Sequence, residues 1–404
     1  MPLLKTLTLL FLTCGPLSAA EPPASYLSPK PAKVLETEYF DVSVKEYAKT
    51  PAFAPSGGAL LVTHDRLLVG ESDGTFCLVN PHSWRSTENY LPRLDMGPSA
   101  DCSLLYLVRE CPARVHGLAY AQQHYYVAYD RYVQSEDRYH FVLSRIKQGE
   151  AAWKDVYVSP PITVPYFSLS SGGKLAVDQS QDRIYVTVGD YSTDRVLHLP
   201  DDIAAQNPAL PFGKVMYLDL KDDSMHVYSM GHRNSQGLAL LNDGRLMASE
   251  HGPRGGDELD IIKANGNYGW PYQSYGTYYG QYARYNVRLR TPPGLVIEKP
   301  IYVFLTPAIA PTQLAQVDGF DPNWNGDLLL GSLRAETLFH IKLVQNHVFY
   351  VEPLPLGHRI RDLVQYEDSF ILLTDEGTLL RITKNAGLPK PEKPLPNSPH
   401  GPCR

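Results

Sequence analysis

The stretch 231–271 holds the residues of this sequence whose types and spacing could do chemistry. Arg233 and Asn234 precede one short apolar run, and Gly252 and Pro253 stand in a loop with three glycines that follows a second run. Such a loop can turn several backbone carbonyls toward one point, which is how calcium is often held. The arginine and the asparagine supply donors for an anion beside that cation. The stretch therefore predicts a site for an anionic ligand and a hard cation.

The alternative interpretation of the same stretch is a solvated turn region of a β-rich protein. Loops rich in glycine and aspartate are common between strands, and this one matches no phosphate-binding loop, dinucleotide fingerprint or EF-hand spacing. Its chemistry therefore depends on which other residues the fold brings beside it.

Short strands in repeated groups must position these residues. Residues 237–241 and 246–249 alternate in the manner of strands around the turn Asn242-Asp243-Gly244, which predicts a hairpin. Similar groups of apolar strands and polar turns recur at 59–80, 115–146, 173–220, 237–262, 314–351 and 360–383. Six such units predict an all-β, six-bladed β-propeller whose loops converge on a central channel, and two stacked β domains are the alternative.

The first residues predict export. A charged start, an apolar run over 7–12 and small residues up to Ala20 are typical of a signal peptide over 1–20, which places the mature protein in the periplasm or outside the cell. A Pro-rich N-terminal segment (21–50) follows, then the propeller over 51–387 and an extended tail over 388–404. No later apolar run is as long as a membrane span.

The charge of the chain bears on its binding partners, and the number of cysteines bears on disulfide pairing. The net charge of −6 and the pI of about 6.1 do not support nucleic-acid binding. Four cysteines remain after the predicted signal peptide, an even number that allows pairing in an oxidising compartment. Cys102 with Cys111 would close a short loop, and Cys77 with Cys403 would tie an early strand to the tail. The oligomeric state is left open.

Several motifs together carry a resemblance to a known family. GHRNSQGL, EHGPRGGDEL and NYGWP, in this order, are joined by IYVTVGD, GDLLLGSLRAETL and LLTDEGTLLRI. The combination resembles the soluble glucose/sorbosone (aldose sugar) dehydrogenases that depend on pyrroloquinoline quinone (PQQ). The resemblance implies a six-bladed propeller that binds PQQ and calcium, oxidises a small-molecule sugar and passes electrons to an acceptor that the sequence does not identify.

The resemblance also implies roles for individual residues. Backbone carbonyls of Gly252 and Pro253 would bind the calcium ion. The cofactor-binding residues would be Arg233, Asn234, Arg334, Arg359 and Arg361. Arg359 and Arg361 are two positions apart, which places both on one face of a strand. Forked guanidinium donors suit a cofactor with three carboxylates.

One departure from the family concerns the general base. The family places a histidine at the start of a His-x-Gly-Gly-Arg-Leu-like motif, and here the residue at that position is Ser170. Serine has no pKa near neutrality and cannot replace imidazole unaided, so His116 is the predicted substitute base. Two functions follow as hypotheses. One is an exported quinoprotein-like oxidoreductase with an altered or lost base, and the other is a non-catalytic propeller that binds a carbohydrate or a protein.

Overall fold

The computed structural model describes residues 25–101, 110–111, 113–162, 170–191, 203–277 and 290–385. Within these ranges the chain forms strands β1 to β29 and one short 3-10 helix, η1 (Ala204–Gln206). None of the helical structure described there is long and apolar enough to cross a membrane. The predicted signal peptide, the tail, Cys102 and Cys403 lie outside the described residues, and so do the two predicted disulfides. Cys77 is buried and has no disulfide partner among the described residues.

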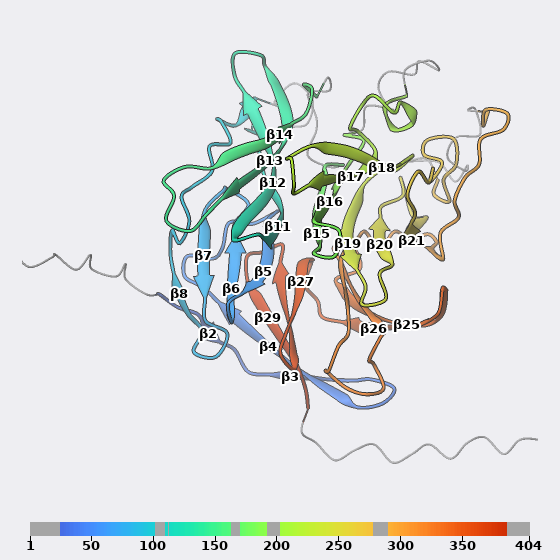
Figure 1. Cartoon of the computed structure of the whole chain (residues 1–404). Coiled ribbons are helices and arrows are strands. Elements are labelled where there is room, and N and C mark those ends of the chain that lie inside the picture. The colour runs from blue at the N-terminus through green and yellow to red at the C-terminus, as the bar shows by residue number, and fades with distance from the viewer. Residues whose placement is uncertain are drawn as a thin grey trace, which may run out of the picture.

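Six antiparallel sheets, which we number as blades 1 to 6 in chain order, surround a central axis (Figure 1). Blade 1 contains β5 (Ala59–Thr63), β6 (Arg66–Gly70), β7 (Phe76–Val79), β8 (Arg85–Thr87) and β1 (Ser25–Tyr26). Blade 2 contains β11 (Val115–Ala121), β12 (His124–Val133), β13 (Arg138–Ile146) and β14 (Lys154–Val158). Blade 3 contains β15 (Gly172–Asp178), β16 (Arg183–Val188), β17 (Lys214–Asp219) and β18 (Met225–Met230).

The second half of the ring is built in the same way. Blade 4 contains β19 (Ser235–Leu240), β20 (Leu246–Glu250), β21 (Asp257–Ile262) and β22 (Tyr302–Phe304). Blade 5 contains β23 (Pro311–Gln316), β24 (Leu328–Ser332), β25 (Thr337–Val344) and β26 (His347–Pro355). Blade 6 contains β27 (Ile360–Tyr366), β28 (Ser369–Thr374), β29 (Leu379–Lys384), β4 (Asp41–Ala48), β2 (Ser28–Pro29) and β3 (Lys33–Glu36). A small hairpin, β9 (Ala100–Asp101) and β10 (Glu110–Cys111), stands apart.

The inner strands close a ring. β5, β11, β15, β19, β23 and β27 each contact the next in order, and β27 contacts β5. The prediction of an all-β, six-bladed β-propeller is therefore confirmed. Because each blade packs its faces against two neighbours, middle strands are buried on both faces: β28 and β24 are buried along their whole length. The outer strand β26 consists mostly of exposed and half-buried residues instead.

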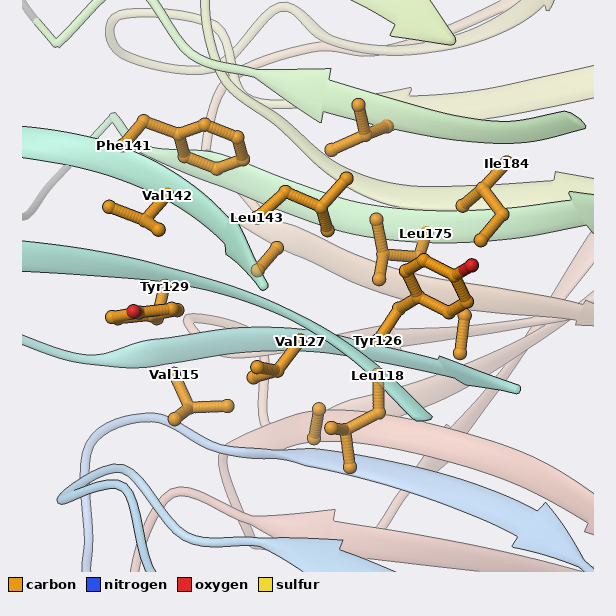
Figure 2. Packing of buried hydrophobic residues seen from close by; sticks show 14 of the residues in the cluster. Val115, Leu118, Tyr126, Val127, Tyr129, Phe141, Val142, Leu143, Leu175 and Ile184 are labelled. Atoms are coloured by element: carbon orange, nitrogen blue, oxygen red, sulfur yellow. The ribbon is translucent and has the colours of Figure 1, made fainter. Parts of the chain in front are cut away.

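Apolar side chains between the blades form the core. Figure 2 shows this packing where blade 2 meets blade 3, with Leu143 of β13 near Leu175 of β15 and Ile184 of β16. Tyr126 and Val127 of β12 are completely buried in the same cluster. Burying a side chain such as leucine stabilises the fold by about 1.5–3 kcal/mol. The core thus holds neighbouring inner strands in fixed relative positions.

The N-terminal strand β4 closes blade 6. It lies within the Pro-rich segment of the sequence and pairs with β29, in a register that runs from Tyr47 opposite Leu379 to Val42 opposite Lys384. Phe40, just before β4, packs its ring against Trp324 of blade 5 with centroids 4.8 Å apart. Segments from the two ends of the propeller therefore share one sheet, which removes an open strand edge.

A buried ion pair joins opposite sides of the ring. Lys174 of β15, in blade 3, places its Nζ 3.2 Å from Oδ1 of Asp362 of β27, in blade 6. Blades 3 and 6 face each other across a ring of six, so this contact crosses the central channel. Burial lowers the pKa of Lys174, while the charge of Asp362 partly restores it.

One side of the ring gathers the segments that hold the predicted site residues, and we call it the site face. The chain enters each inner strand from this side, and because the strands of a blade run antiparallel, the turn between its second and third strands returns there. The residues before β15, β19 and β27 and the turns after β20 and β24 hold most of the predicted site residues.

Candidate functional site

The loop between β20 and β21 is folded tightly on the site face. Gly255 and Gly256 both have a φ of 67°, in the left-handed region that favours glycine. A Cβ on Gly252 would lie 2.2 Å from the Gly255 carbonyl oxygen, so only glycine fits there. Asp257 holds the loop in place. Its Oδ1 accepts from the Gly252 N–H at 2.9 Å, and its Oδ2 accepts from the backbone N–H groups of residues 309 and 310, just before blade 5. Pro253 is buried.

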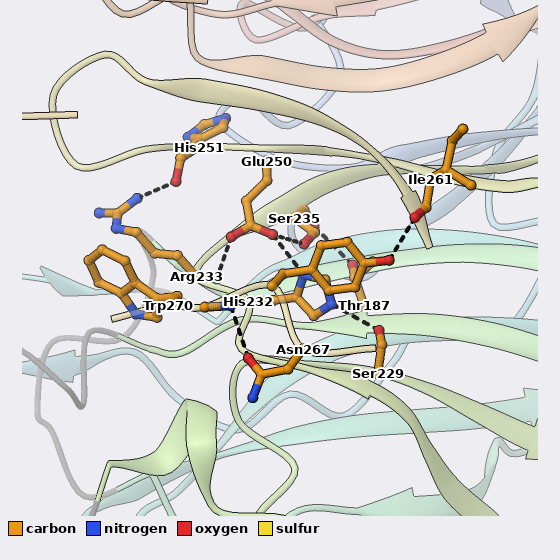
Figure 3. Close-up of polar contacts among 12 residues, drawn as sticks. Thr187, Ser229, His232, Arg233, Ser235, Glu250, His251, Ile261, Asn267 and Trp270 are labelled. Carbon is orange, nitrogen blue, oxygen red and sulfur yellow. Dashed lines mark hydrogen bonds and ion pairs between the residues drawn. The ribbon is translucent and has the colours of Figure 1, made fainter. Parts of the chain in front are cut away.

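Arg233 reaches into this loop from the start of β19. Its Nη1 donates to the carbonyls of His251 at 3.0 Å and Gly252 at 3.1 Å, and its guanidinium carbon lies 5.5 Å from the centre of the Trp270 ring (Figure 3). Only 6% of Arg233 is exposed, and its Nε has no hydrogen-bond partner among the described residues. The cation is thus held between an aromatic ring and two carbonyl oxygens, with a donor left over.

Glu250 organises the segment that carries Arg233. One carboxylate oxygen accepts from the Arg233 N–H at 2.5 Å, and the other lies 3.0 Å from Nδ1 of His232 and 2.7 Å from Oγ of Ser235 (Figure 3). Burial alone would raise the pKa of Glu250, but these hydrogen bonds bring it below its usual value. The ionised carboxylate therefore fixes the backbone from which the Arg233 side chain departs.

The positive charges of two predicted arginines, Arg233 and Arg361, both act on His251. Its Nε2 is 2.7 Å from the Pro311 carbonyl, to which it donates. Burial and the charges of Arg233 and Arg361 lower the pKa of His251, against the opposing effect of Asp257. A neutral imidazole with its proton on Nε2 fits both observations. The arginines of blades 4 and 6 therefore act on one region of the site face.

Arg359 and Arg361 share one carboxylate. Arg359 Nε donates to Oδ2 of Asp375 at 2.9 Å, and Arg361 donates to Oδ1 from Nε at 3.0 Å and Nη2 at 2.6 Å. Burial would raise the pKa of Asp375, but the arginine charges lower it. The two side chains therefore lie on one face, as their spacing predicts. Two guanidinium groups on one carboxylate leave an excess positive charge.

Arg334 is the outermost of the predicted basic residues. It is exposed, in the turn between β24 and β25. The residue before it, Leu333, accepts a hydrogen bond at its carbonyl from Nη1 of Arg359 at 3.3 Å. The turn of blade 5 and the start of blade 6 are thus adjacent, and Arg334 extends the positive charge of the other two arginines toward solvent.

Asn234 and Ser170 connect blades 3 and 4. The Asn234 Oδ1 accepts from the N–H of Gly172 at 3.3 Å and from the side chain of Gln236 at 2.9 Å. Ser170 is 1% exposed, and its carbonyl accepts from the Tyr191 N–H at 3.0 Å. A Cβ on Gly189 would lie 1.8 Å from that carbonyl oxygen, so the backbone of residue 170 is fixed by close packing.

His116 lies at the start of β11, in the blade next to Ser170. Its Nε2 is 2.7 Å from Oδ2 of Asp130, and the side chains of the pair are 9% and 0% exposed. Asp130 Oδ1 accepts from the Tyr191 hydroxyl at 2.7 Å. Asp190, the neighbour of Tyr191, accepts from Trp270 Nε1 at 3.0 Å.

The structure places all nine predicted site residues on the site face, in three groups. Arg233, Asn234, Gly252 and Pro253 belong to blade 4, Arg334, Arg359 and Arg361 to blades 5 and 6, and Ser170 and His116 to blades 3 and 2. Sequence reasoning missed the acidic partners Asp130, Glu250 and Asp375. An aspartate at a turn is common, and only the contact partner distinguishes these three.

Known proteins match the chain over most of the propeller. The Glucose / Sorbosone dehydrogenase family matches residues 118–382. The chain is 33% identical over 222 residues to an uncharacterised protein of Synechocystis, covering 50% of this chain and 53% of that protein. It is 26% identical over 291 residues to quinoprotein glucose dehydrogenase B of Acinetobacter calcoaceticus, covering 53% and 60%. It is 31% identical over 164 residues to aldose sugar dehydrogenase YliI of Escherichia coli, covering 39% and 43%.

Solved structures share the fold over longer stretches. A glucose dehydrogenase has a TM-score of 0.66 at 25% identity, covering 83% of this chain and 98% of that one. The soluble aldose sugar dehydrogenase of Escherichia coli, in its apo-form, has a TM-score of 0.68 at 20% identity, covering 85% and 100%. The sequence matches to the curated relatives span only about half of their length. The family match covers more than half of this chain, and the chain belongs to the glucose/sorbosone dehydrogenase family.

Proposed function

We propose that this protein is a quinoprotein-type sugar dehydrogenase that oxidises an aldose or a related sugar alcohol with PQQ and calcium. The cofactor would bind on the site face to Arg233, Asn234, Arg334, Arg359 and Arg361. The observation that carries the proposal is the buried Arg233 guanidinium, whose Nη1 is fixed by two carbonyls and whose Nε has no hydrogen-bond partner among the described residues. Such a preformed cationic donor suits a ligand that gains negative charge during reaction.

The charge balance of the site fits a polyanionic cofactor. Arg359 and Arg361 are balanced by a single carboxylate, and Arg334 is exposed beside them. Guanidinium groups bind carboxylates through two parallel donors, so three arginines can hold and orient a cofactor with three carboxylates. When bound, PQQ would supply a quinone that accepts a hydride, and with it two electrons, from the sugar carbon. Arg233 would then stabilise the negative charge that develops on the quinone oxygen.

The residues expected to bind calcium are partly used by Arg233. The Gly252 carbonyl, one of the two expected ligands, accepts a hydrogen bond from Arg233 at 3.1 Å. A carbonyl oxygen has two lone pairs, but a cation bound there would repel the guanidinium unless an anion lies between them. We therefore propose that calcium binds together with the anionic cofactor, with Gly252 and Pro253 as carbonyl ligands. Calcium alone should bind weakly.

Export is a further part of the proposal. The residue pattern of 1–20 supports export to the periplasm or beyond. N-terminal sequencing of the protein recovered from a periplasmic extract would show cleavage near Ala20 if this is correct.

Reconstitution of the purified protein tests the proposed function. PQQ absorbance is followed during titration into the protein with calcium, and its reduction is then followed with a panel of aldoses. We expect saturable binding that is lost in Arg233→Ala, and reduction by at least one sugar. Arg93→Ala, which removes an exposed arginine of the loop after β8, is the control. The absence of saturable binding would contradict the proposal.

The alternative function is a propeller that binds a carbohydrate or a protein without turnover. The serine at position 170 favours it, since a buried serine cannot act as a general base unaided. This alternative predicts that no sugar reduces the bound cofactor, or that the cofactor does not bind and a carbohydrate does. Calorimetry with the same aldoses, in the absence of PQQ, distinguishes a binding propeller from an enzyme that needs its cofactor.

A further inference from the structure

We propose that His116, oriented by Asp130 and Tyr191, accepts the proton of the sugar hydroxyl in place of the base that is missing at Ser170. This inference rests on the proposed function and specifies its proton acceptor. It is carried by a chain of buried side chains that joins blade 2 to the segment holding Ser170.

The hydrogen bonds fix the tautomer of His116. The Tyr191 hydroxyl donates to Oδ1 of Asp130 at 2.7 Å, and burial together with Asp130 raises the pKa of Tyr191, which keeps that hydroxyl protonated. Asp130 Oδ2, 2.7 Å from His116 Nε2, is then an acceptor, so Nε2 carries the proton. In a neutral ring Nδ1 is the basic nitrogen, and none of the described residues hydrogen-bonds to it.

Hydrogen bonds connect Asp130, the partner of His116, to Ser170, the position at which the family has its base. Tyr191 contributes its hydroxyl to Asp130 and its backbone N–H to the carbonyl of Ser170 at 3.0 Å. A Cβ on Gly173 would lie 2.3 Å from Cβ of His116, so the imidazole stem lies directly against the glycine pair that follows Ser170. Asp130 is itself fixed, since its N–H donates to the Arg114 carbonyl at 3.0 Å. His116 therefore adjoins the segment in which the family places its base.

The other polar groups nearby are less suited to take a proton. Both ring nitrogens of His232 are occupied, by Glu250 at 3.0 Å and Ser229 at 2.9 Å. Nε2 of His251 donates to the Pro311 carbonyl at 2.7 Å, and the Arg233 guanidinium donates to the backbone carbonyl of His251 at 3.0 Å, so a cation already lies beside it. His116 instead has a carboxylate at 2.7 Å, which stabilises the imidazolium that forms.

The step balances in atoms and electrons. The O–H bond of the sugar hydroxyl breaks and its proton forms an N–H bond with Nδ1 of His116. The C–H electron pair of the same carbon leaves as hydride to the quinone oxidant, and a C=O bond forms. The sugar carbon is oxidised by two electrons and the quinone is reduced by two. His116 then releases its proton to solvent before the next turnover.

The test compares His116→Ala with Asp130→Asn and with the control His124→Ala, on the neighbouring strand of the same blade. In the protein loaded with PQQ and calcium, we expect His116→Ala to slow sugar-dependent cofactor reduction by about 100-fold to 10,000-fold. Added imidazole should restore part of that rate. Asp130→Asn, as a positioning variant, should lower kcat by roughly 100-fold with KM and cofactor Kd within about twofold. His124→Ala should match the unmodified protein.

A spectroscopic readout is independent of turnover. In the protein without cofactor, the ¹⁵N resonances of His116 should show a protonated Nε2 and an unprotonated Nδ1, and Asp130→Asn should change that tautomer distribution. A protonated Nδ1 with Nε2 as acceptor would overturn the inference. So would a His116→Ala variant that reduces the cofactor at nearly the normal rate, or an unmodified protein that binds the cofactor and oxidises no sugar. Failure of the unmodified protein to bind PQQ overturns the proposed function, and with it this role of His116.

Discussion

The ion pair across the channel should respond unequally to loss of its two members. Lys174 Nζ is 3.2 Å from Asp362 Oδ1, and the two side chains are 4% and 6% exposed. Apart from this ion pair, the ammonium has no hydrogen-bond partner among the described residues. Asp362, by contrast, accepts from the N–H groups of Leu60 at 2.8 Å and Leu363 at 3.0 Å. The carboxylate can therefore remain buried without its partner more easily than the lysine can.

The expected magnitudes follow from this asymmetry. Asp362→Asn leaves a buried ammonium without a counter-charge, which typically costs about 3–5 kcal/mol. Lys174→Met leaves a carboxylate with two donors and also removes repulsion between Lys174 and Arg361, so its cost should stay below about 1.5 kcal/mol, the scale of one net hydrogen bond. The double variant should be more stable than Asp362→Asn alone by about 2 kcal/mol, a coupling of ordinary size for residues in contact.

Urea unfolding at neutral pH, followed by far-UV circular dichroism, measures all four proteins. With about 2.1 cal/mol/K of unfolding entropy per residue over roughly 360 residues, 3–5 kcal/mol corresponds to a fall in Tm of about 4–7 °C. Equal costs for the two single variants would refute the argument from hydrogen-bond partners. A double variant less stable than Asp362→Asn would refute the claim that the isolated ammonium is the source of the cost.

Four further outcomes can be checked with similar measurements. Burial lowers the pKa of Lys174 in the folded protein below the value of about 10.5 that it has in the unfolded chain. The stability that this shift contributes is fully present above about pH 10.5 and is lost as the pH falls through the lower native pKa. In urea unfolding at alkaline pH, the unmodified protein should therefore gain stability with rising pH relative to Lys174→Met. Burial opposes protonation of His340, but hydrogen bonds to Asp327 and Glu352 raise its pKa, so the stability that it contributes is complete below about pH 6.5 and is lost as the pH rises through the native pKa. His340→Gln should therefore lower the free energy of unfolding more at pH 6 than at pH 9. The reverse order would contradict this. Glu250→Gln should weaken PQQ binding by about tenfold in an absorbance titration, because the neutral amide cannot accept both from the Arg233 backbone and from His232 as the carboxylate does. Arg361→Ala should weaken PQQ binding by about 10-fold to 100-fold through loss of a charge-assisted contact, whereas Arg381→Ala, on β29 of the same blade, should not.

The fold was predictable from local patterns. Apolar runs of strand length separated by Gly, Asn and Asp turns recur six times, and each group corresponds to one observed blade. The closing strand was not predictable, because β4 lies within the Pro-rich N-terminal segment and its partner β29 lies more than 300 residues later. Its pairing depends on the ring being complete, and no local pattern indicates that.

The candidate site divides in the same way between sequence and structure. The residue types, the turn glycines at 255 and 256 and the same-face spacing of Arg359 and Arg361 could be predicted, since these depend on nearby positions. The partners could not: Asp375 for the two arginines, and Asp130 and Tyr191 for His116, are known from the folded chain alone. These contacts join residues of different strands or blades, and their distances are set by how the blades pack around the axis. Whether a histidine has a carboxylate beside it, and hence what it can do, is decided at that level.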